Sequence, residues 1–287
     1  MAANLSPSKK RKQLVLDLVA TLIVLLLALL VVLPIWWIFR SSLMSTAKLN
    51  EYPPSFIPHE WLWANYSKAL ETFEYWRYFR NTFSIIIPAV TFGTVTAIFC
   101  GYAFARLRFR GKKLIFNICV GTILLPSMVT LLPLYVVWTK GLGLGDTYWP
   151  LILPYLTGGG FFNIFLIRQF LMTIPKELDE AASIDGAGEW YIFLKIILPL
   201  CGPVIATLVI FQVVNQWNNF LWPLVVVSNP KKQVISVGLA MFNASETARY
   251  LGPRLAVSVL GAIPLMIVYL FLQKYIVQSV MLSGVKE

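Results

Sequence analysis

The stretch KELDEAASIDGAGEWYIFLKIILPL, Lys176–Leu200, lies between two long apolar runs. Pro175 precedes it, at a position where a helix can begin without the N–H that proline lacks. Three acidic residues follow in the first helical turn, where the helix dipole favours negative charge: Glu177, Asp179 and Glu180. Asp185-Gly186 is a typical helix end. The stretch therefore predicts a short, capped helix outside the apolar runs.

A second short helix is expected from Glu189 to Ile197, and Ala187-Gly188 permits a sharp reversal between the two helices. We call residues 175–197 the polar insert. It is too polar to span a membrane, and its helix ends are too well defined for a plain linker. Ala181 and Ala182 leave a shallow surface that a cleft of another protein can cover closely. The insert is therefore predicted to be a docking site.

The composition is that of a membrane protein. Hydrophobic residues make up 58% of the chain, charged residues 13%, and the mean hydropathy is +0.72, whereas soluble domains carry about 25% charged residues. The net charge of +11 resides largely in short segments beside apolar runs, which favours a membrane surface over nucleic acid. Cys100, Cys119 and Cys201 lie within apolar runs and indicate packing rather than disulfides. The single histidine, His59, argues against a histidine-based catalytic or metal site.

Six apolar runs are long enough to cross a bilayer as helices, and we place the spans at about 14–39, 82–105, 114–138, 148–170, 198–227 and 255–277. They form a single transmembrane domain, 14–287, after a basic N-terminal segment, 1–13. Basic clusters at Lys9–Lys12 and Arg106–Lys113 indicate that both termini and the insert are cytoplasmic. The expected fold is an all-α membrane protein of six transmembrane helices, with the insert between spans four and five.

Two segments carry local expectations. The external segment 40–80 is rich in Trp, Tyr and Pro, which favours a helix on the outer leaflet over a specific partner surface. Gly158–Gly160, in the middle of span four, permits close helix approach or a bend.

The spans lack an internal source of energy. After Asp17, the centres of the predicted spans contain no Asp, Glu, Lys, Arg or His, although ion-coupled carriers usually place such groups on the ion path. The sequence has no Walker A pattern and no plausible nucleophile–base pair. The chain is therefore expected to be non-catalytic, without a cofactor or metal of its own, and to receive energy from a partner through the polar insert.

Span five carries a polar face. Four amides recur at i, i+3, i+4 and i+7, flanked by Trp217 and Phe220: Gln212, Asn215, Gln216 and Asn219. Amides beside an aromatic plane can bind hydroxyl groups and stack on a sugar ring, which predicts a translocation path. The same amides can instead bind span five to neighbouring helices. The sequence leaves both interpretations open.

The insert also resembles a known motif. Glu180-Ala181-Ala182, three residues, Gly186, nine residues, Ile196, one residue and Leu198-Pro199 reproduce the spacing of the EAA loop in permease subunits of binding-protein-dependent ABC importers. Other segments are similar to the maltose-type, sugar-importing branch: Gly101–Arg106 through Gly111-Lys112, Arg168–Phe170, Trp217–Phe220 and Gly284–Lys286. The resemblance covers nearly the whole chain from about Leu14 onward.

The resemblance implies a set of partners in a bacterial or archaeal cytoplasmic membrane. These are a second homologous permease, two ATPase subunits that bind ATP and Mg, an extracytoplasmic solute-binding protein and membrane lipid. The substrate implied is a sugar or oligosaccharide, with a related polar solute such as a glycerol phosphate as the alternative. A stand-alone secondary carrier, an ABC exporter half and a membrane scaffold are rival interpretations.

The resemblance also assigns residue roles. It implies that Glu180 anchors the insert to the ATPase by polar contact, and that Asp185 caps the helix or bonds locally. Small residues permit the close fit: Ala181, Ala182 and Gly186. Gly188, at the reversal, is counted with them in the coupling loop. The loop 228–254 would contact the solute-binding protein. A second contact with the ATPases would come from the C-terminal tail: Gly284, Val285 and Lys286.

Overall fold

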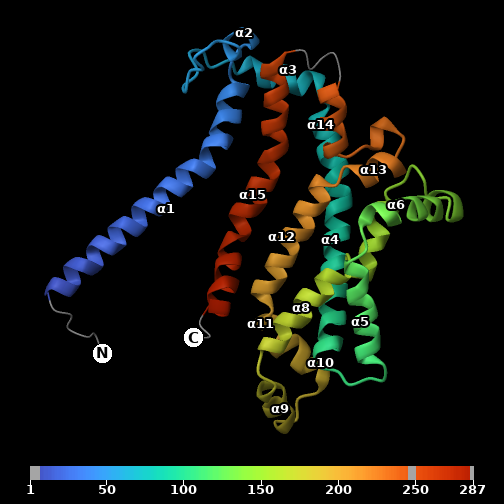
Figure 1. The fold of residues 1–287 in the computed structure, drawn as a ribbon. Coiled ribbons are helices and arrows are strands. Elements are labelled where there is room, and N and C mark those ends of the chain that lie inside the picture. Colours follow the sequence, from blue (N-terminus) through green and yellow to red (C-terminus); the bar gives the residue numbers. More distant parts are fainter. Residues whose placement is uncertain (1–6, 245–249, 285–287) are drawn as a thin grey trace. The chain divides into compact units, whose positions relative to one another are not determined.

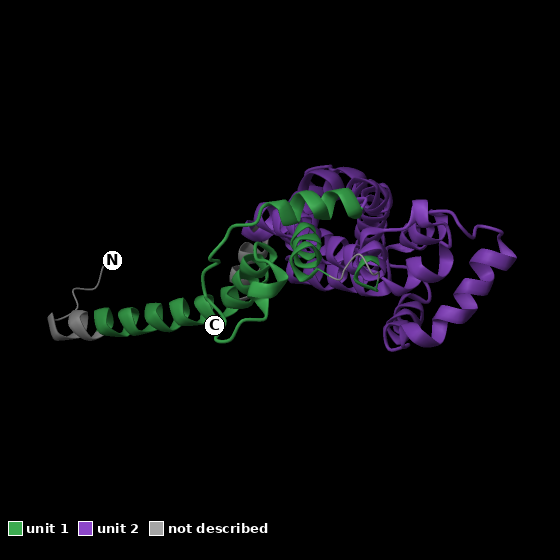
Figure 2. Cartoon of the chain, turned by 90° about the horizontal axis from the view of Figure 1, so that it is seen from above, with its two compact units in different colours: residues 1–73, 242–260 green, residues 74–241, 261–287 purple. Residues whose placement is uncertain are grey.

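The computed structural model describes residues 7–244 and 250–284, which contain helices and connecting segments but no strand. The chain divides into two compact units, coloured separately in Figure 2. Unit 1 comprises Met1–Phe73 and Phe242–Leu260, and unit 2 comprises Glu74–Met241 and Gly261–Glu287. The C-terminal helix, α15 (Leu251–Gly284), begins in unit 1 and continues into unit 2.

Unit 1 contains α1 (Pro7–Ser42), α2 (Thr46–Leu49) and α3 (Ala64–Thr72). The apolar part of α1, Gln13–Ser42, has a mean hydropathy of 3.2 in its most apolar window, none of which is buried within the chain. The turn after α1 is held by Asn65, whose amide donates to the carbonyls of Ser42 (2.9 Å) and Met44 (3.1 Å).

The segment 40–80, expected to be external, differs from the expected surface helix. Only the short helices α2 and α3 form within it, and from Tyr75 onward it already belongs to α4 (Tyr75–Ala105). Residues between α2 and α3 fold back toward the end of α1, where the Trp36 indole donates to the Phe56 carbonyl (3.2 Å). Prolines at 53, 54 and 58 explain the absence of helix, because proline removes backbone donors.

In unit 2, α4 packs against α8 (Phe161–Thr173) and α12 (Gly202–Asn218), and α5 (Lys112–Ile123) packs against α8 (Figure 1). The contact between α4 and α8 is close because Gly101 has no side chain: a Cβ there would lie 2.5 Å from Cγ2 of Ile167. Around this contact lies an apolar core that includes Ala97, Ile167, Ile197 and Leu208, all with 0% exposure.

Two of the expected spans are not continuous helices. In the third, α5 and α6 (Ser127–Val136, extended by the π-helical turn Val137–Gly141) meet at 99°. Pro126 occupies the N-cap of α6 in an extended conformation, which ends α5 before it. In the fifth, the helical run Glu189–Leu200 meets α12 at 70°. The helix α12 ends at Asn218 and a separate α13 (Leu221–Val226) follows.

The fourth expected span is also modified in its middle. α7 (Trp149–Ile152) continues as a 3-10 turn, Leu153–Thr157, and three glycines with positive φ precede α8. At Gly159 a Cβ would lie 2.8 Å from the Asn163 amide nitrogen, so a side chain there would displace a hydrogen-bonding group. The glycines therefore interrupt the regular helix between α7 and α8 and provide the close approach that the sequence permits.

The membrane-spanning character of the fold is confirmed by length and composition. Within residues 7–244 and 250–284, four helical segments can each cross a membrane, and the number rises to six if each bent pair is one broken span. The single segments are Gln13–Ser42, Tyr75–Ala105, Trp149–Thr173 and Leu251–Lys274. Between α13 and α15 lie a short 3-10 turn (Pro230–Lys232) and α14 (Ile235–Ala244).

Candidate functional site

The first half of the polar insert forms the predicted capped helix, α9 (Glu177–Ile184). Asp185 is its C-cap, and Gly186 follows with φ +83°, the left-handed conformation that glycine adopts without cost. The backbone N–H of Ala187 then returns to the Ala182 carbonyl (2.9 Å). This hydrogen bond reverses the chain direction into α10 (Glu189–Tyr191), for which Gly188 is the N-cap.

The second half of the insert differs from expectation. The helix expected over Glu189–Ile197 forms, with a π-helical turn from Ile192 to Ile197, but it continues without interruption into α11 (Leu198–Leu200). Ile192, Phe193 and Ile197 are buried in the core described above. Their apolar side chains pack against the bundle, and this explains why only the first half of the insert remains a surface element.

The residues predicted to dock a partner are mostly accessible. Glu180, Ala181, Asp185, Gly186 and Gly188 are exposed, whereas Ala182 is half-buried against the core. One neighbour was missed by sequence reasoning: Ile184, which is 86% exposed. Ile184 lies four residues after Glu180, and helical periodicity alone could have placed the two on one face. The exposed side of α9 thus combines a carboxylate, small residues and one large apolar side chain.

The insert is attached to the bundle through a buried ion pair. Arg106 Nε lies 2.9 Å from Asp179 Oδ2, and Arg106 Nη2 donates to the Ile174 carbonyl at 2.9 Å. Burial raises the pKa of Asp179 above its ordinary value, and this effect is larger than the opposing attraction of Arg106. The sequence pattern places Arg106 in a basic loop and Asp179 in the acidic first turn of a helix, and neither position indicates that the two are in contact.

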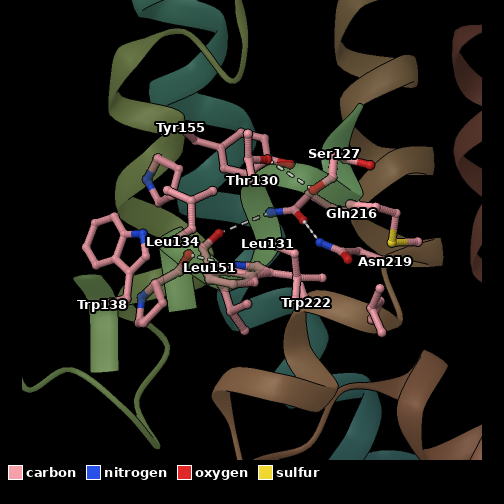
Figure 3. A pocket seen from close by; sticks show the side chains of 14 residues that line it. Ser127, Thr130, Leu131, Leu134, Trp138, Leu151, Tyr155, Gln216, Asn219 and Trp222 are labelled. Carbon is pink, nitrogen blue, oxygen red and sulfur yellow. Dashed lines mark hydrogen bonds between the residues drawn. The ribbon is translucent and has the colours of Figure 1, made fainter. Parts of the chain in front are cut away.

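A second candidate site is a pocket of about 440 Å³ in unit 2, which we call the Gln216 pocket (Figure 3). Its walls come from α6, the segment that begins with α7, and the end of α12 with α13. Polar and aromatic side chains line it together: Ser127, Thr130, Trp138, Tyr155, Gln216, Asn219 and Trp222. The remainder of the lining is apolar, and no charged side chain is among the lining residues.

The predicted amide face divides between two functions. Gln216 and Asn219 line the pocket; the Gln216 amide donates to the Leu151 carbonyl (3.3 Å), and its oxygen accepts from Asn219 (3.4 Å). Gln212 is only 3% exposed and donates to Thr94 of α4 (3.1 Å), so it binds two helices together. Asn215 is exposed outside the pocket lining. The structure therefore brings together two of the four amides at the pocket.

Trp217, expected beside the amides, lies elsewhere. Its indole is 4% exposed, donates to the Gly261 carbonyl (3.1 Å), and meets the rings of Phe79 and Phe83 edge to face. The aromatic walls of the pocket come instead from Trp138, Tyr155 and Trp222. Trp138 follows the bend in the third expected span, Tyr155 lies in the 3-10 turn of the fourth, and Trp222 lies on α13 beyond the end of α12, so no short-range pattern shows that they meet.

The tail predicted to touch a partner falls mainly beyond the described part of the chain. Gly284 is the last residue of α15, and Val285 and Lys286 lie outside the described residues.

Comparison with known proteins identifies relatives of the whole chain. Residues 89–282 match the family described as binding-protein-dependent transport system inner membrane component. An arabinooligosaccharides transport system permease protein of Halalkalibacterium halodurans is 37% identical over 212 residues, 74% of this chain and 75% of that protein. A diacetylchitobiose uptake system permease protein of Streptomyces coelicolor is 30% identical over 90% of this chain and 85% of its own length.

The fold has a solved counterpart. A chain in the crystal structure of a bacterial ABC transporter involved in the import of the acidic polysaccharide alginate superposes with a TM-score of 0.76 and 25% identity, covering 93% of this chain and 98% of that one. The helical architecture, the exposed half-insert and these matches agree. The chain belongs to the family of binding-protein-dependent transport system inner membrane components.

Proposed function

We propose that this chain is the non-catalytic permease subunit of an ATP-driven importer for a sugar or oligosaccharide. The observation that carries the proposal is α9, a capped helix that exposes Glu180, Ala181 and Ile184 at the end of the bundle. A side chain as large and apolar as Ile184, left 86% exposed beside a carboxylate, suits a protein partner better than water. Relatives whose names describe uptake systems support the same function.

The proposed assembly contains a second homologous permease, two ATPase subunits that bind ATP and Mg, and an extracytoplasmic solute-binding protein. Both termini and the polar insert would face the cytoplasm, in one transmembrane domain over 14–287. The loop 228–254 would contact the solute-binding protein, and the tail from Gly284 would contact the ATPases. The exposed arginines Arg108 and Arg110 beside α5 support this orientation, because basic residues favour the cytoplasmic side.

In the proposed mechanism, closure of the ATPases displaces α9 and thereby moves the bundle between inward- and outward-open states. Glu180 supplies a polar anchor, and Ile184 fills an apolar depression in the partner. Ala181 and Gly186 keep the contact close, because neither has a side chain long enough to separate the surfaces. Asp185 and Gly186 fix the direction in which α9 ends, so the displacement reaches the bundle through a defined turn.

The Gln216 pocket is proposed to contact the solute during transfer. Amides and hydroxyls can exchange hydrogen bonds with sugar hydroxyls, while indole and phenol rings offer flat apolar faces. The absence of Lys and Arg from the pocket lining favours a neutral saccharide over a glycerol phosphate. Diacetylchitobiose and arabinooligosaccharides, named for the two relatives, belong to this class of neutral saccharides.

The test is ATP-driven uptake by the complete importer in proteoliposomes. The solute is the ligand that thermal-shift screening identifies for the co-encoded solute-binding protein. Glu180→Lys and Gly186→Trp are expected to abolish uptake while the complex still assembles and hydrolyses ATP. A cross-linker at Ala181, which is exposed, should capture an ATPase subunit. Uptake by the permease in vesicles without an ATPase would instead indicate a secondary carrier, and unchanged uptake in both variants would overturn the coupling role of α9.

A further inference from the structure

Three segments of unit 2 meet at one side chain, that of Arg106. The residue is the C-cap of α4, and its backbone N–H donates to the Tyr102 carbonyl (2.8 Å). Its guanidinium group donates to the Ile174 carbonyl at the end of α8 and lies 2.9 Å from the Asp179 carboxylate on α9. Arg106 therefore connects the end of α4 to both ends of the link between α8 and α9.

This arginine differs from its neighbours in the same basic loop. The Arg106 side chain is 6% exposed and that of Asp179 is 22% exposed, whereas Arg108 and Arg110 are exposed to solvent. Arg106 is thus the member of the cluster that is built into the protein. The predicted positive-inside role accounts for the exposed arginines but gives no reason to bury this one.

Burial of this ion pair carries a desolvation cost. A buried ion pair loses hydration on both sides, and here desolvation of Asp179 outweighs the attraction of Arg106, as the raised pKa of the carboxyl shows. Arg106 Nε lies 2.9 Å from Asp179 Oδ2 as an ion pair but makes no hydrogen bond there. Asp179 Oδ1 is also buried without a hydrogen-bond partner. The pair therefore holds unused hydrogen-bonding capacity, which a small shift of α9 can engage.

The end of α4 is also well placed to pass a displacement onward. α4 packs along both α8 and α12, and Thr94 in its middle accepts the hydrogen bond from Gln212. One turn farther along α12 lies Gln216, and Asn219 is the C-cap at the end of the helix; both line the Gln216 pocket. A rigid connection from α9 to α4 thus leads through packed helices to the pocket walls.

We propose that Arg106 is a positioning residue that transmits the movement of α9 directly to α4, through its contacts with Asp179 and Ile174. The inference rests on the proposed function, since it specifies how the importer's coupling helix drives the bundle. Without the contact, α9 would be joined to the bundle by the backbone of Ile174-Pro175, the turn at Gly186 and apolar packing that includes Ala182. The ATPases could then move α9 without moving α4 to the same extent.

The experiment measures solute uptake and ATP hydrolysis together in the reconstituted complete importer, for Arg106→Gln, Asp179→Ala and the double variant. Arg108→Gln is the matched control, since it removes an exposed arginine from the same loop. Each single variant is expected to lower uptake per ATP hydrolysed about tenfold, and the double variant no further, because contacting residues that act through each other are not additive. Arg108→Gln should keep the wild-type ratio.

A merely structural role gives a different result. It lowers the yield or melting temperature of the complex but leaves uptake per ATP unchanged in the molecules that assemble, and that outcome overturns the proposal. Strictly multiplicative losses in the double variant also overturn it. If Arg106→Gln does not assemble, Arg106→Lys replaces it, because a single ammonium group cannot reproduce both contacts of the guanidinium fork. Arg106→Lys should give an intermediate ratio of uptake to ATP hydrolysed, and a wild-type ratio overturns the proposal. Failure of the proposed function itself is distinguishable, because wild-type protein would then show no ATP-dependent uptake.

Discussion

The two halves of the polar insert have similar lengths but opposite environments. α9 is exposed along most of its length, with Ile184 86% accessible, whereas the run that begins at α10 buries Ile192, Phe193 and Ile197 in the core. The reversal at Asp185–Gly188 separates them. A surface helix can be optimised for a partner only if a neighbouring helix holds it in place. The second half provides that support, and α12 shows the same division between buried Gln212 and exposed Asn215.

The sharpest test of this division places the same charge on each half. Ile197→Asp buries an unpaired carboxylate at a position with 0% exposure. We expect the free energy of unfolding to fall by several kcal/mol, so that the variant fails to fold. Ile184→Asp should leave the melting temperature of the purified permease unchanged but prevent copurification of an ATPase. Thermal melting and affinity pull-down check the pair. A folded Ile197→Asp protein would contradict the assignment of the second half to the core.

The division on α12 can be tested with two asparagines four residues apart. Asn219→Leu removes a polar group from the Gln216 pocket, and we expect about a tenfold loss of solute uptake, the cost of one or two hydrogen bonds, with normal assembly. Asn215→Leu, outside the pocket lining, should keep uptake within about twofold of wild type. Initial uptake rates at several solute concentrations distinguish the two. Equal effects would remove the pocket from the path.

The reversal between the halves can be weakened at one glycine and not at the other. Gly186→Ala places a residue with a side chain at φ +83° and should cost about 1 kcal/mol in local stability. We expect this strain to displace the end of α9 and to lower uptake severalfold. Gly188 has φ −75° and open space around its Cβ position, so Gly188→Ala should behave as wild type. ATP-driven uptake compares them. A silent Gly186→Ala would show that the direction of α9 is not critical.

The smallest expected effect concerns pH. Since burial raises the pKa of Asp179, the stability contributed by its neutral form is complete below the unfolded pKa and is lost as the pH rises through the raised folded pKa. Asp179→Asn stays neutral throughout. Its melting temperature should exceed that of wild type by about 2 °C or less at neutral pH, and the difference should vanish on acidification below that window. A difference that grows on acidification would contradict the sign of the shift.

The features that could be predicted from the sequence are those set by neighbouring residues. The cap at Asp185-Gly186, the acidic first turn and the apolar runs depend on local physics, and α9 and the membrane helices follow from them. The positions of Gln216 and Asn219 on one face also depend only on helical periodicity. The exposed Ile184 could also have been assigned to the docking face of α9 by helical periodicity, because it lies four residues after Glu180.

The features that could not be predicted depend on distant residues or on backbone breaks. Arg106 and Asp179 are separated by a long stretch of sequence, and each has an adequate local explanation that conceals their contact. Trp138, Tyr155 and Trp222 line one pocket although they come from three expected spans, and the 99° bend between α5 and α6 is not specified by any local pattern. Trp217 looked like a pocket residue beside the amides, yet the packing of Phe79 and Phe83 keeps it elsewhere.

The high hydropathy of α1 has a consequence for biosynthesis. A helix with a mean hydropathy of 3.2 and no buried window partitions into lipid without help from other parts of its own chain, while Trp149–Thr173, at 1.5, gains from preformed neighbours. The nascent polypeptide should therefore anchor through α1 without tertiary partners, whereas Trp149–Thr173 should leave the translocon only when it packs against α4, which is synthesised before it. Membrane integration then proceeds in two stages, with the early helix fixing the orientation that all later ones inherit.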